Sequence, residues 1–299
     1  MAAEVARYWR HSAVPGVDLL RARFVTHRYG RHSHETYTLA LIESGVEEFD
    51  YGGRLLRAGP GAVALLNPEV AHTGHAGVPD GWAYRVLYPQ VGVVTGMAAE
   101  LGWPRGTPDF RDTVIFDARS AAVLRAAHVA AEHGDRLASS SLLSAAVATL
   151  LSAHAGPARA SARAAPPCRP GRAPGAVALV RDLLGEQLTQ PPSLDELARR
   201  TGMSPFALLR AFRAETGLPP HAYLNQQRVR SARLLLDDGA PPARVAAQTG
   251  FADQAHLTRH FKRVVGVPPG AYQRERRRAS RRGLGAAGKN VQDQPLPRP

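Results

Sequence analysis

The sequence predicts an α+β multidomain protein: an N-terminal antiparallel β-barrel with a helical hairpin, and a C-terminal all-α domain with a double helix-turn-helix. Three observations lead to this prediction. Short apolar runs alternate with turn residues from Leu19 to Tyr88, and two alanine-rich segments follow. The last third of the chain then contains one unit twice, at an offset of 48 or 49 residues. A length of 299 residues suggests about two domains.

Residues 1–117 have the pattern of a sensing barrel. Gly52-Gly53 is a hairpin signal, and Gly59-Pro60-Gly61 marks a further turn. Many short strands at this spacing are typical of an antiparallel barrel or a jelly roll. The candidate strands are Leu19–Thr26, Thr36–Glu43, Gly45–Tyr51, Arg54–Ala58, Ala62–Leu66 and Trp82–Tyr88.

Three histidines are candidate ligand-binding residues of this barrel. His32 and His34 lie on one side of an extended segment, and His72 follows a turn. The arrangement resembles the cupin barrel. Metal-binding cupins also have a glutamate about four residues beyond the second histidine, where this chain has Thr38, so a zinc or iron site would lack one ligand. We therefore expect no metal or other cofactor; the histidines either line the barrel mouth or bind a small organic ligand, with an incomplete metal site as the third alternative.

A second group of candidate ligand-binding residues lies on the last predicted strand. Trp82, Tyr84 and Tyr88 could supply aromatic walls for a small-molecule effector, and Arg85 could bind its carboxylate or phosphate. The alternative for the aromatic residues is a place in the core, where large apolar side chains on strands usually lie. The identity of the effector does not follow from these residues.

Residues 118–154 are predicted to form two coupling helices, Ala118–His133 and Leu137–His154, separated at Gly134-Asp135. They either form a homodimer interface or pack as a hairpin within the chain. Residues 155–175 are rich in Pro, Gly, Ala and Arg, which predicts a linker. Residues 276–299 are predicted to be a disordered basic tail that attracts DNA without sequence preference.

Residues 176–275 contain the repeated unit, and each copy is predicted to be two helices around a tight turn. Ser193 and Glu196 form a capping box at the start of the first copy. Gly202 suits the sharp turn, and Ser204-Pro205 begins the second helix of the pair. In a helix-turn-helix the second helix enters the DNA major groove. In the second copy this helix is expected over 254–265, with Asp253 as its cap.

The faces of these two helices can be assigned from their periodicity. Leu208 and Phe212 are spaced i, i+4, as are Leu257 and Phe261, so both pairs should be buried. Arginine can bind guanine and glutamine can bind adenine in the major groove. The predicted DNA-facing residues are Phe206, Leu209, Arg210, Arg213, Gln254, Ala255, Thr258 and Arg259, and the predicted phosphate contacts are Lys262, Arg263, Arg228 and Arg230.

The segment GFADQAHLTRHFKRVVGVPPGAYQ, residues 250–273, closely resembles the signature of AraC/XylS-type transcription regulators, and residues 194–224 resemble the other half of that domain. The resemblance covers the last third of the chain. It implies that the two helices enter successive major-groove segments on one face of double-stranded DNA, held apart by a joining helix near residues 222–236. Residues 81–89 also resemble the sensory half of such regulators.

The charge distribution agrees with DNA as a partner. Residues 1–154 contain 14 arginines and 15 acidic residues, whereas residues 176–275 contain 13 basic and 9 acidic residues, and residues 276–299 contain 7 and 1. Binding through phosphates would weaken steeply with salt. Cys168 is the single cysteine, which excludes an internal disulfide. Residues 1–12 have no apolar core typical of a signal peptide, and no stretch of eighteen apolar residues occurs. We therefore expect a cytoplasmic protein without membrane contact.

The sequence thus predicts a regulator, not an enzyme, whose barrel senses a small molecule and whose helical domain binds a specific DNA site. Two alternatives stay open. One is a metal-dependent cupin enzyme fused to a DNA-binding domain, which needs a complete set of metal ligands. The other is an architectural binder with little preference among DNA sequences.

Overall fold

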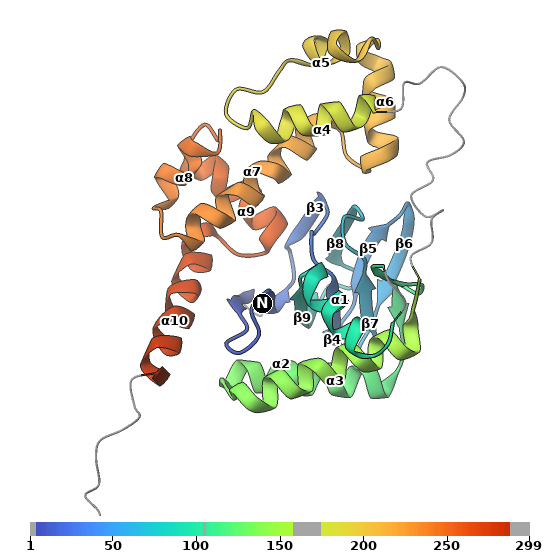
Figure 1. Cartoon of the computed structure of the whole chain (residues 1–299), viewed down its shortest axis with the longest axis vertical. Helices are drawn as coiled ribbons and strands as arrows, with labels where there is room; N and C mark the ends of the chain where they lie inside the picture. Colours follow the sequence, from blue (N-terminus) through green and yellow to red (C-terminus); the bar gives the residue numbers. More distant parts are fainter. Residues whose placement is uncertain (1–3, 104–105, 158–174, 288–299) are drawn as a thin grey trace, which may run out of the picture.

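A computed structural model describes residues 4–103, 106–157 and 175–287. A sheet-rich N-terminal part lies beside a helical C-terminal part, and helices α2 and α3 run under the sheets (Figure 1). All strand pairings among the described residues are antiparallel. The predicted α+β fold class is therefore confirmed.

Two sheets form the N-terminal part, in the strand orders β1-β2-β9-β4-β7-β11 and β3-β8-β5-β6. Leu20 and Trp82 of the first sheet belong to the same buried core as Phe49 of the second, so the two sheets face each other. The first sheet consists of β1 (Val5–Arg10), β2 (Val17–Phe24), β9 (Trp82–Pro89), β4 (Thr38–Gly45), β7 (Val63–Leu66) and β11 (Val114–Ile115). The second consists of β3 (Arg28–His32), β8 (His72–Ala76), β5 (Glu47–Tyr51) and β6 (Arg54–Ala58).

All six predicted strands are present, but the sequence did not predict β1, β3, β8 and β11 of these two sheets. Strands β3 and β8 have the sequences RYGRH and HTGHA, which contain glycine and few apolar residues. They pair with each other in the sheet, and His32 lies opposite His72. Their pairing comes from tertiary context, which outweighs the weak local preference of these residues for strands.

Helices α2 (Ala118–His133) and α3 (Arg136–His154) form a hairpin on the outer face of the six-stranded sheet. The side chain of Asp117 caps α2, and Gly134 ends it with a φ of 82°. Leu124 of α2 and Leu150 of α3 belong to the core beneath them, together with α1 (Val91–Glu100). The two helices thus pack as a hairpin within the chain, and the homodimer interface stays a prediction. By length and composition alone α3 could cross a membrane, a test that core helices also pass.

Two predicted boundaries differ from the structure. Residues 155–157 were assigned to the linker, but Ala155–Pro157 forms strand β12, which pairs with β10 (Pro108–Phe110). Residues 158–174 lie outside the described residues. The tail was predicted to be disordered from residue 276, but α10 (Pro269–Ala287) continues through its first half, and Arg276 is anchored at Asp18 of β2. The remaining tail residues, 288–299, also lie outside the described part.

The C-terminal part consists of seven helices in the described residues, and their ends follow the predicted signals. Ser193, Ser204 and Asp253 each accept a backbone hydrogen bond at a helix start. Gly217 and Gly266 end the two presumed reading helices with φ of 75° and 84°. The helices are α4 (Ala176–Glu186), α5 (Leu194–Thr201), α6 (Pro205–Thr216), α7 (Pro220–Asp237), α8 (Pro242–Gln248), α9 (Gln254–Val265) and α10.

Candidate DNA-binding surface, barrel pocket and the contact between them

Helix α6 is the second helix of the first helix-turn-helix. Leu208 and Phe212 are fully buried, as their spacing predicts. Phe206 is 66% exposed, and the guanidinium of Arg210 lies 4.8 Å from the centre of its ring. Arg213 is also exposed, whereas Leu209 is half-buried. The predicted DNA-facing side of α6 is therefore mostly open to solvent, with an arginine held over an aromatic ring.

Helix α9 has the same arrangement in the second unit. Leu257 and Phe261 are fully buried, so the opposite face points outward. The four predicted DNA contacts on this face all reach the surface: Gln254, Ala255 and Arg259 are exposed, and Thr258 is half-buried. Lys262 and Arg263 are exposed in the last turn. Arg210 and Arg259 are both exposed, as a DNA-contacting role requires.

Two arginines of the joining helix α7, predicted to contact phosphates, have partners within the chain. Arg228 is 8% exposed and donates a hydrogen bond of 2.9 Å to the carbonyl oxygen of Leu188. Arg230 forms ion pairs with Glu35 and Glu69 of the N-terminal part, at 3.2 and 3.0 Å. Both guanidinium groups are therefore engaged by residues that are distant in sequence, which the sequence did not predict.

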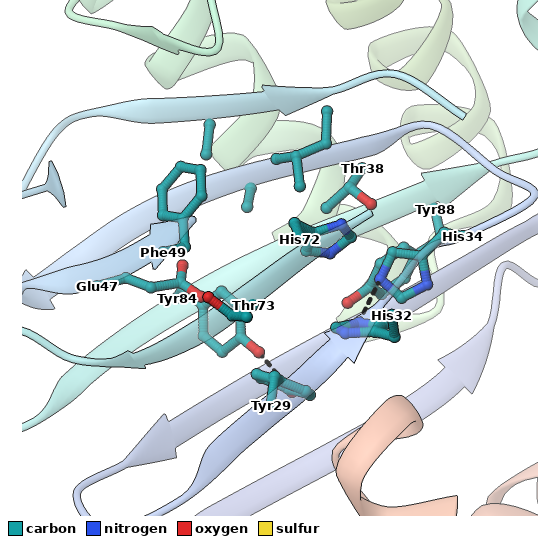
Figure 2. A pocket seen from close by; sticks show the side chains of 13 residues that line it. Tyr29, His32, His34, Thr38, Glu47, Phe49, His72, Thr73, Tyr84 and Tyr88 are labelled. Carbon is teal, nitrogen blue, oxygen red and sulfur yellow. Dashed lines mark hydrogen bonds between the residues drawn. The ribbon is translucent and has the colours of Figure 1, made fainter. Parts of the chain in front are cut away.

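The barrel encloses a cavity of about 40 Å³ between its two sheets. His32, His34 and His72 lie at one end, near Thr38 and Tyr88, whereas Glu47 lies at the other end (Figure 2). The nitrogen atoms that could act as ligands, one from each histidine, all lie within 4.8 Å of one another. The structure thus brings together the three histidines that the sequence singled out, around a cavity rather than at the barrel surface.

The protonation states in this cavity follow from its burial. Burial and the neighbouring histidines hold the pKa of His32 and that of His34 well below the ordinary value, and burial lowers the pKa of His72 to about 4. Burial also raises the pKa of the Glu47 carboxyl to about 8. At neutral pH the cavity therefore holds neutral imidazoles and mostly protonated Glu47.

Of the candidate ligand-binding residues on β9, Tyr84 and Tyr88 line this cavity, whereas Trp82 and Arg85 do not. Trp82 packs in the core, with its ring centre 5.4 Å from that of Phe24. Arg85 points to the opposite face of β9, where it forms ion pairs with Glu43 at 2.9 Å and Glu132 at 2.6 Å. It fastens helix α2 to the sheet and does not face this cavity, where the sequence predicted a ligand anchor. Neighbouring positions on a strand alternate between faces, and Arg85 lies an odd number of residues from Trp82.

Sequence reasoning missed Glu47 and Tyr29 as cavity-lining residues. The phenol oxygens of Tyr29 and Tyr84 are 2.8 Å apart inside the barrel. A signal for Glu47 existed: it lies two residues before Phe49 on β5, so both side chains point to the same face. Tyr29 had no comparable signal because β3 was not predicted.

A direct contact joins the histidine segment to the C-terminal part. Ser33, between His32 and His34, is buried against Gln226 of α7. The backbone N–H of Ser33 donates to Oε1 of Gln226 at 3.1 Å, and Nε2 of Gln226 donates to the carbonyl oxygen and the hydroxyl of Ser33 at 3.0 and 2.8 Å. We call this set of three hydrogen bonds the Ser33–Gln226 contact. It connects one wall of the cavity to the helix that joins the two helix-turn-helix units.

A buried charge network holds the two parts together at a second place. Asp18 of β2 accepts hydrogen bonds from Arg276 at 2.6 and 2.9 Å, from Arg233 at 2.8 Å and from Tyr8 at 3.0 Å. Asp18 is largely buried, but Arg276 and Arg233 lower its carboxyl pKa below the ordinary value against that desolvation. Tyr272 of α10 packs near Tyr8, with ring centres 5.5 Å apart. The core is therefore continuous across the boundary.

Comparison with known protein families decides the kind of protein. Residues 14–147 match the AraC-like ligand binding domain, and residues 197–275 match a helix-turn-helix domain family. The chain belongs to the AraC family of transcription regulators. This AraC-family protein is therefore a DNA-binding regulator with an N-terminal ligand-binding domain, in a family of regulators rather than of enzymes.

Individual relatives of this AraC-family protein agree with the assignment. It is 26% identical over 242 residues to the uncharacterized HTH-type transcriptional regulator YbfI of Bacillus subtilis, a match that covers 81% of this chain and 86% of YbfI. It is 48% identical over 61 residues to the regulatory protein PchR of Pseudomonas aeruginosa, covering 20% of this chain and 21% of PchR. The crystal structure of ToxT from Vibrio cholerae has the same fold, with a TM-score of 0.51 at 12% identity over 91% of this chain and 97% of ToxT.

Proposed function

We propose that this protein recognises one asymmetric site in double-stranded DNA through α6 and α9, and that a ligand in the barrel cavity changes its affinity for that site. The proposed base-reading side chains are Phe206, Leu209, Arg210, Arg213, Gln254, Ala255, Thr258 and Arg259, with Lys262 and Arg263 on phosphates. The two units differ in these side chains, so they are expected to prefer different bases.

The Ser33–Gln226 contact is the observation that carries the regulatory half of the proposal. Its three hydrogen bonds join the segment between two cavity histidines to α7. A ligand that moves His32 or His34 must strain or release this contact, and so it has a different affinity for the docked and the undocked arrangement. Such a difference in affinity is what a ligand needs to shift an equilibrium between two states.

Selection of bound duplexes from random DNA tests the DNA-binding half. The full chain should enrich a site with two different sequence elements, about 10 base pairs apart from centre to centre, as for two helices that enter successive turns of one groove. Enrichment of no sequence, with binding that depends on salt alone, would instead indicate an architectural binder.

A further inference from the structure

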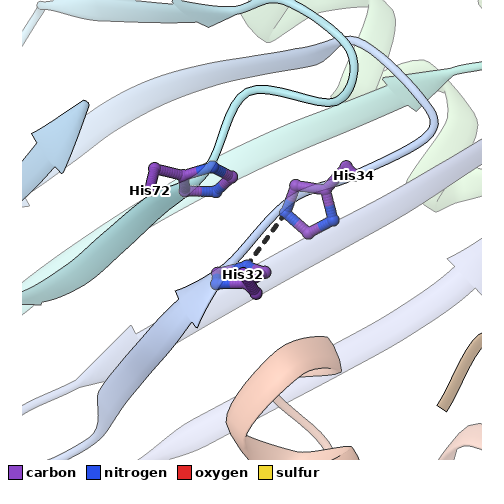
Figure 3. Close-up of side chains that lie close together, drawn as sticks. All are labelled: His32, His34 and His72. Atoms are coloured by element: carbon purple, nitrogen blue, oxygen red, sulfur yellow. Dashed lines mark hydrogen bonds between the residues drawn. The ribbon is translucent and has the colours of Figure 1, made fainter. Parts of the chain in front are cut away.

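The geometry of the three cavity histidines suits a ligand smaller than an organic effector. His32 lies at the end of β3, His34 in the segment after it, and His72 at the start of β8 (Figure 3). The pairing of His32 with His72 across the two strands fixes two of the rings. Their ring centres are 4.4 Å apart, and those of His34 and His72 are 5.1 Å apart.

Backbone carbonyls fix the tautomers of two of these rings. Nδ1 of His32 lies 2.7 Å from the carbonyl oxygen of Gly30, and Nδ1 of His72 lies 3.0 Å from that of Val70. A carbonyl oxygen only accepts, so each Nδ1 carries the proton and each neutral ring has its lone pair on Nε2. Histidines that bind metal ions typically donate their other ring N–H in this way, which orients the ring.

One distance already matches that of a coordinated pair. Nε2 of His32 and Nε2 of His34 are 3.2 Å apart. Two nitrogen atoms that bind one tetrahedral zinc ion at about 2.0–2.1 Å lie about 3.3 Å from each other. Because Nε2 of His32 has the lone pair, the N–H at Nε2 of His34 is the donor in this pair. A bound ion would require the other neutral tautomer of His34, with its proton on Nδ1.

The cavity also has the size and the polar atoms that an ion needs. Its volume of about 40 Å³ is far below the roughly 300–1,000 Å³ of pockets for drug-sized ligands. Thr38 lines it, and among the described residues the buried Oγ1 of Thr38 has no hydrogen-bond partner. This hydroxyl could bind a water molecule in the fourth coordination position. Glu47, at the other end of the cavity, is the acidic side chain among the lining residues, and loss of its proton when a cation binds would offset part of the charge of that cation.

We propose that the cavity binds one divalent transition-metal ion through His32, His34 and His72. A set of three imidazoles suits zinc, iron, nickel, cobalt or copper, whereas magnesium and calcium prefer oxygen ligands. The inference deepens the proposed function, because it names the class of ligand that the sensing barrel takes.

Titration of the metal-free full chain with Co²⁺ tests this site. A chain without a histidine tag is stripped with a chelator, and uptake is followed by calorimetry and by the visible absorption of Co²⁺. The wild type should bind one equivalent and show the spectrum of a four-coordinate or five-coordinate ion. His34→Gln and His72→Gln should each lose at least tenfold in affinity, because each removes one of three ligands.

His75→Ala is the matched control, because His75 lies on β8 with His72 but pairs with Glu48, away from the histidine cluster. It should bind Co²⁺ like the wild type. Thermal unfolding shows whether each variant folds, and Co²⁺ should raise the melting temperature of the wild type and His75→Ala but not of His34→Gln. Absence of uptake by the wild type, or equal uptake by His34→Gln and His72→Gln, would overturn the site.

The outcome for DNA is measured separately, on the selected duplex with and without Co²⁺. Uptake of one ion without a change in DNA affinity would support the metal site and contradict its role in regulation. Absence of uptake would remove the metal site and leave open a different ligand for the regulator.

Discussion

Replacement of Gln226 by alanine tests whether the cavity wall and the DNA-binding part are held together as the structure shows. The change removes all three hydrogen bonds of the Ser33–Gln226 contact. Each hydrogen bond contributes about 1 kcal/mol net to the stability of the docked arrangement. Water can replace part of the three lost bonds, so the docked arrangement should lose about 2 kcal/mol. That energy corresponds to a roughly thirtyfold shift of the docking equilibrium.

Hydrogen exchange measures this shift directly, because the backbone N–H of Ser33 is the donor to Gln226. In Gln226→Ala the amide of Ser33 should exchange roughly thirty times faster, since local opening limits its exchange. Gln227→Ala, one residue further along α7, is the control and should leave the rate unchanged. An unchanged Ser33 rate in a folded Gln226→Ala protein would refute the contact and the proposed route of regulation.

Three further predictions concern the interface, the barrel and the DNA surface. Asp18→Asn should lower the free energy of unfolding in urea by about 3 kcal/mol, because it removes the carboxylate that buried Arg276 and half-buried Arg233 share, while Arg276 keeps its ion pair with Asp237; a loss below 1 kcal/mol would contradict this network. The folded-state pKa of Glu47 is raised to about 8, so the stability that its proton contributes is present at pH 4 and is lost as the pH rises toward 8. Glu47→Gln should therefore raise the melting temperature relative to wild type at pH 8 more than at pH 5, and an equal difference at both pH values would count against a buried neutral carboxyl. Lys262→Ala should weaken binding to all duplexes alike and lower the slope of log affinity against log salt by about one, and a change at a single base position would indicate base contact instead.

Local signals explain which parts of the fold were predictable. Ser204 and Asp253 are caps, and Gly217 and Gly266 are helix ends, so the bounds of α6 and α9 follow from a few neighbouring residues. Strands β3 and β8 have no such signal, because their polar residues become strand residues only by pairing with each other. The histidines of these strands were still singled out, since their residue type and spacing do not depend on the strand assignment.

The charged side chains of the interface were the least predictable. Arg276 belongs to a basic run that suggests a solvated tail, but it is 7% exposed and binds Asp18. The two residues are 258 positions apart, and no local pattern indicates such a pair. The hydrogen bond from Arg228 to the carbonyl oxygen of Leu188 was unpredictable for the same reason. The direction of Arg85, in contrast, could have been inferred from the alternation of faces along β9.

Site selection with Arg210→Ala and Arg259→Ala most directly tests whether the two repeated helices read one DNA site. Each selection starts from the same random duplexes as the wild type. Arg210→Ala should lose base preference in one of the two sequence elements and Arg259→Ala in the other, each at a cost of about 1–3 kcal/mol for the preferred duplex. Loss of preference in the same element by both variants, or an equal loss of affinity for all duplexes, would contradict the account.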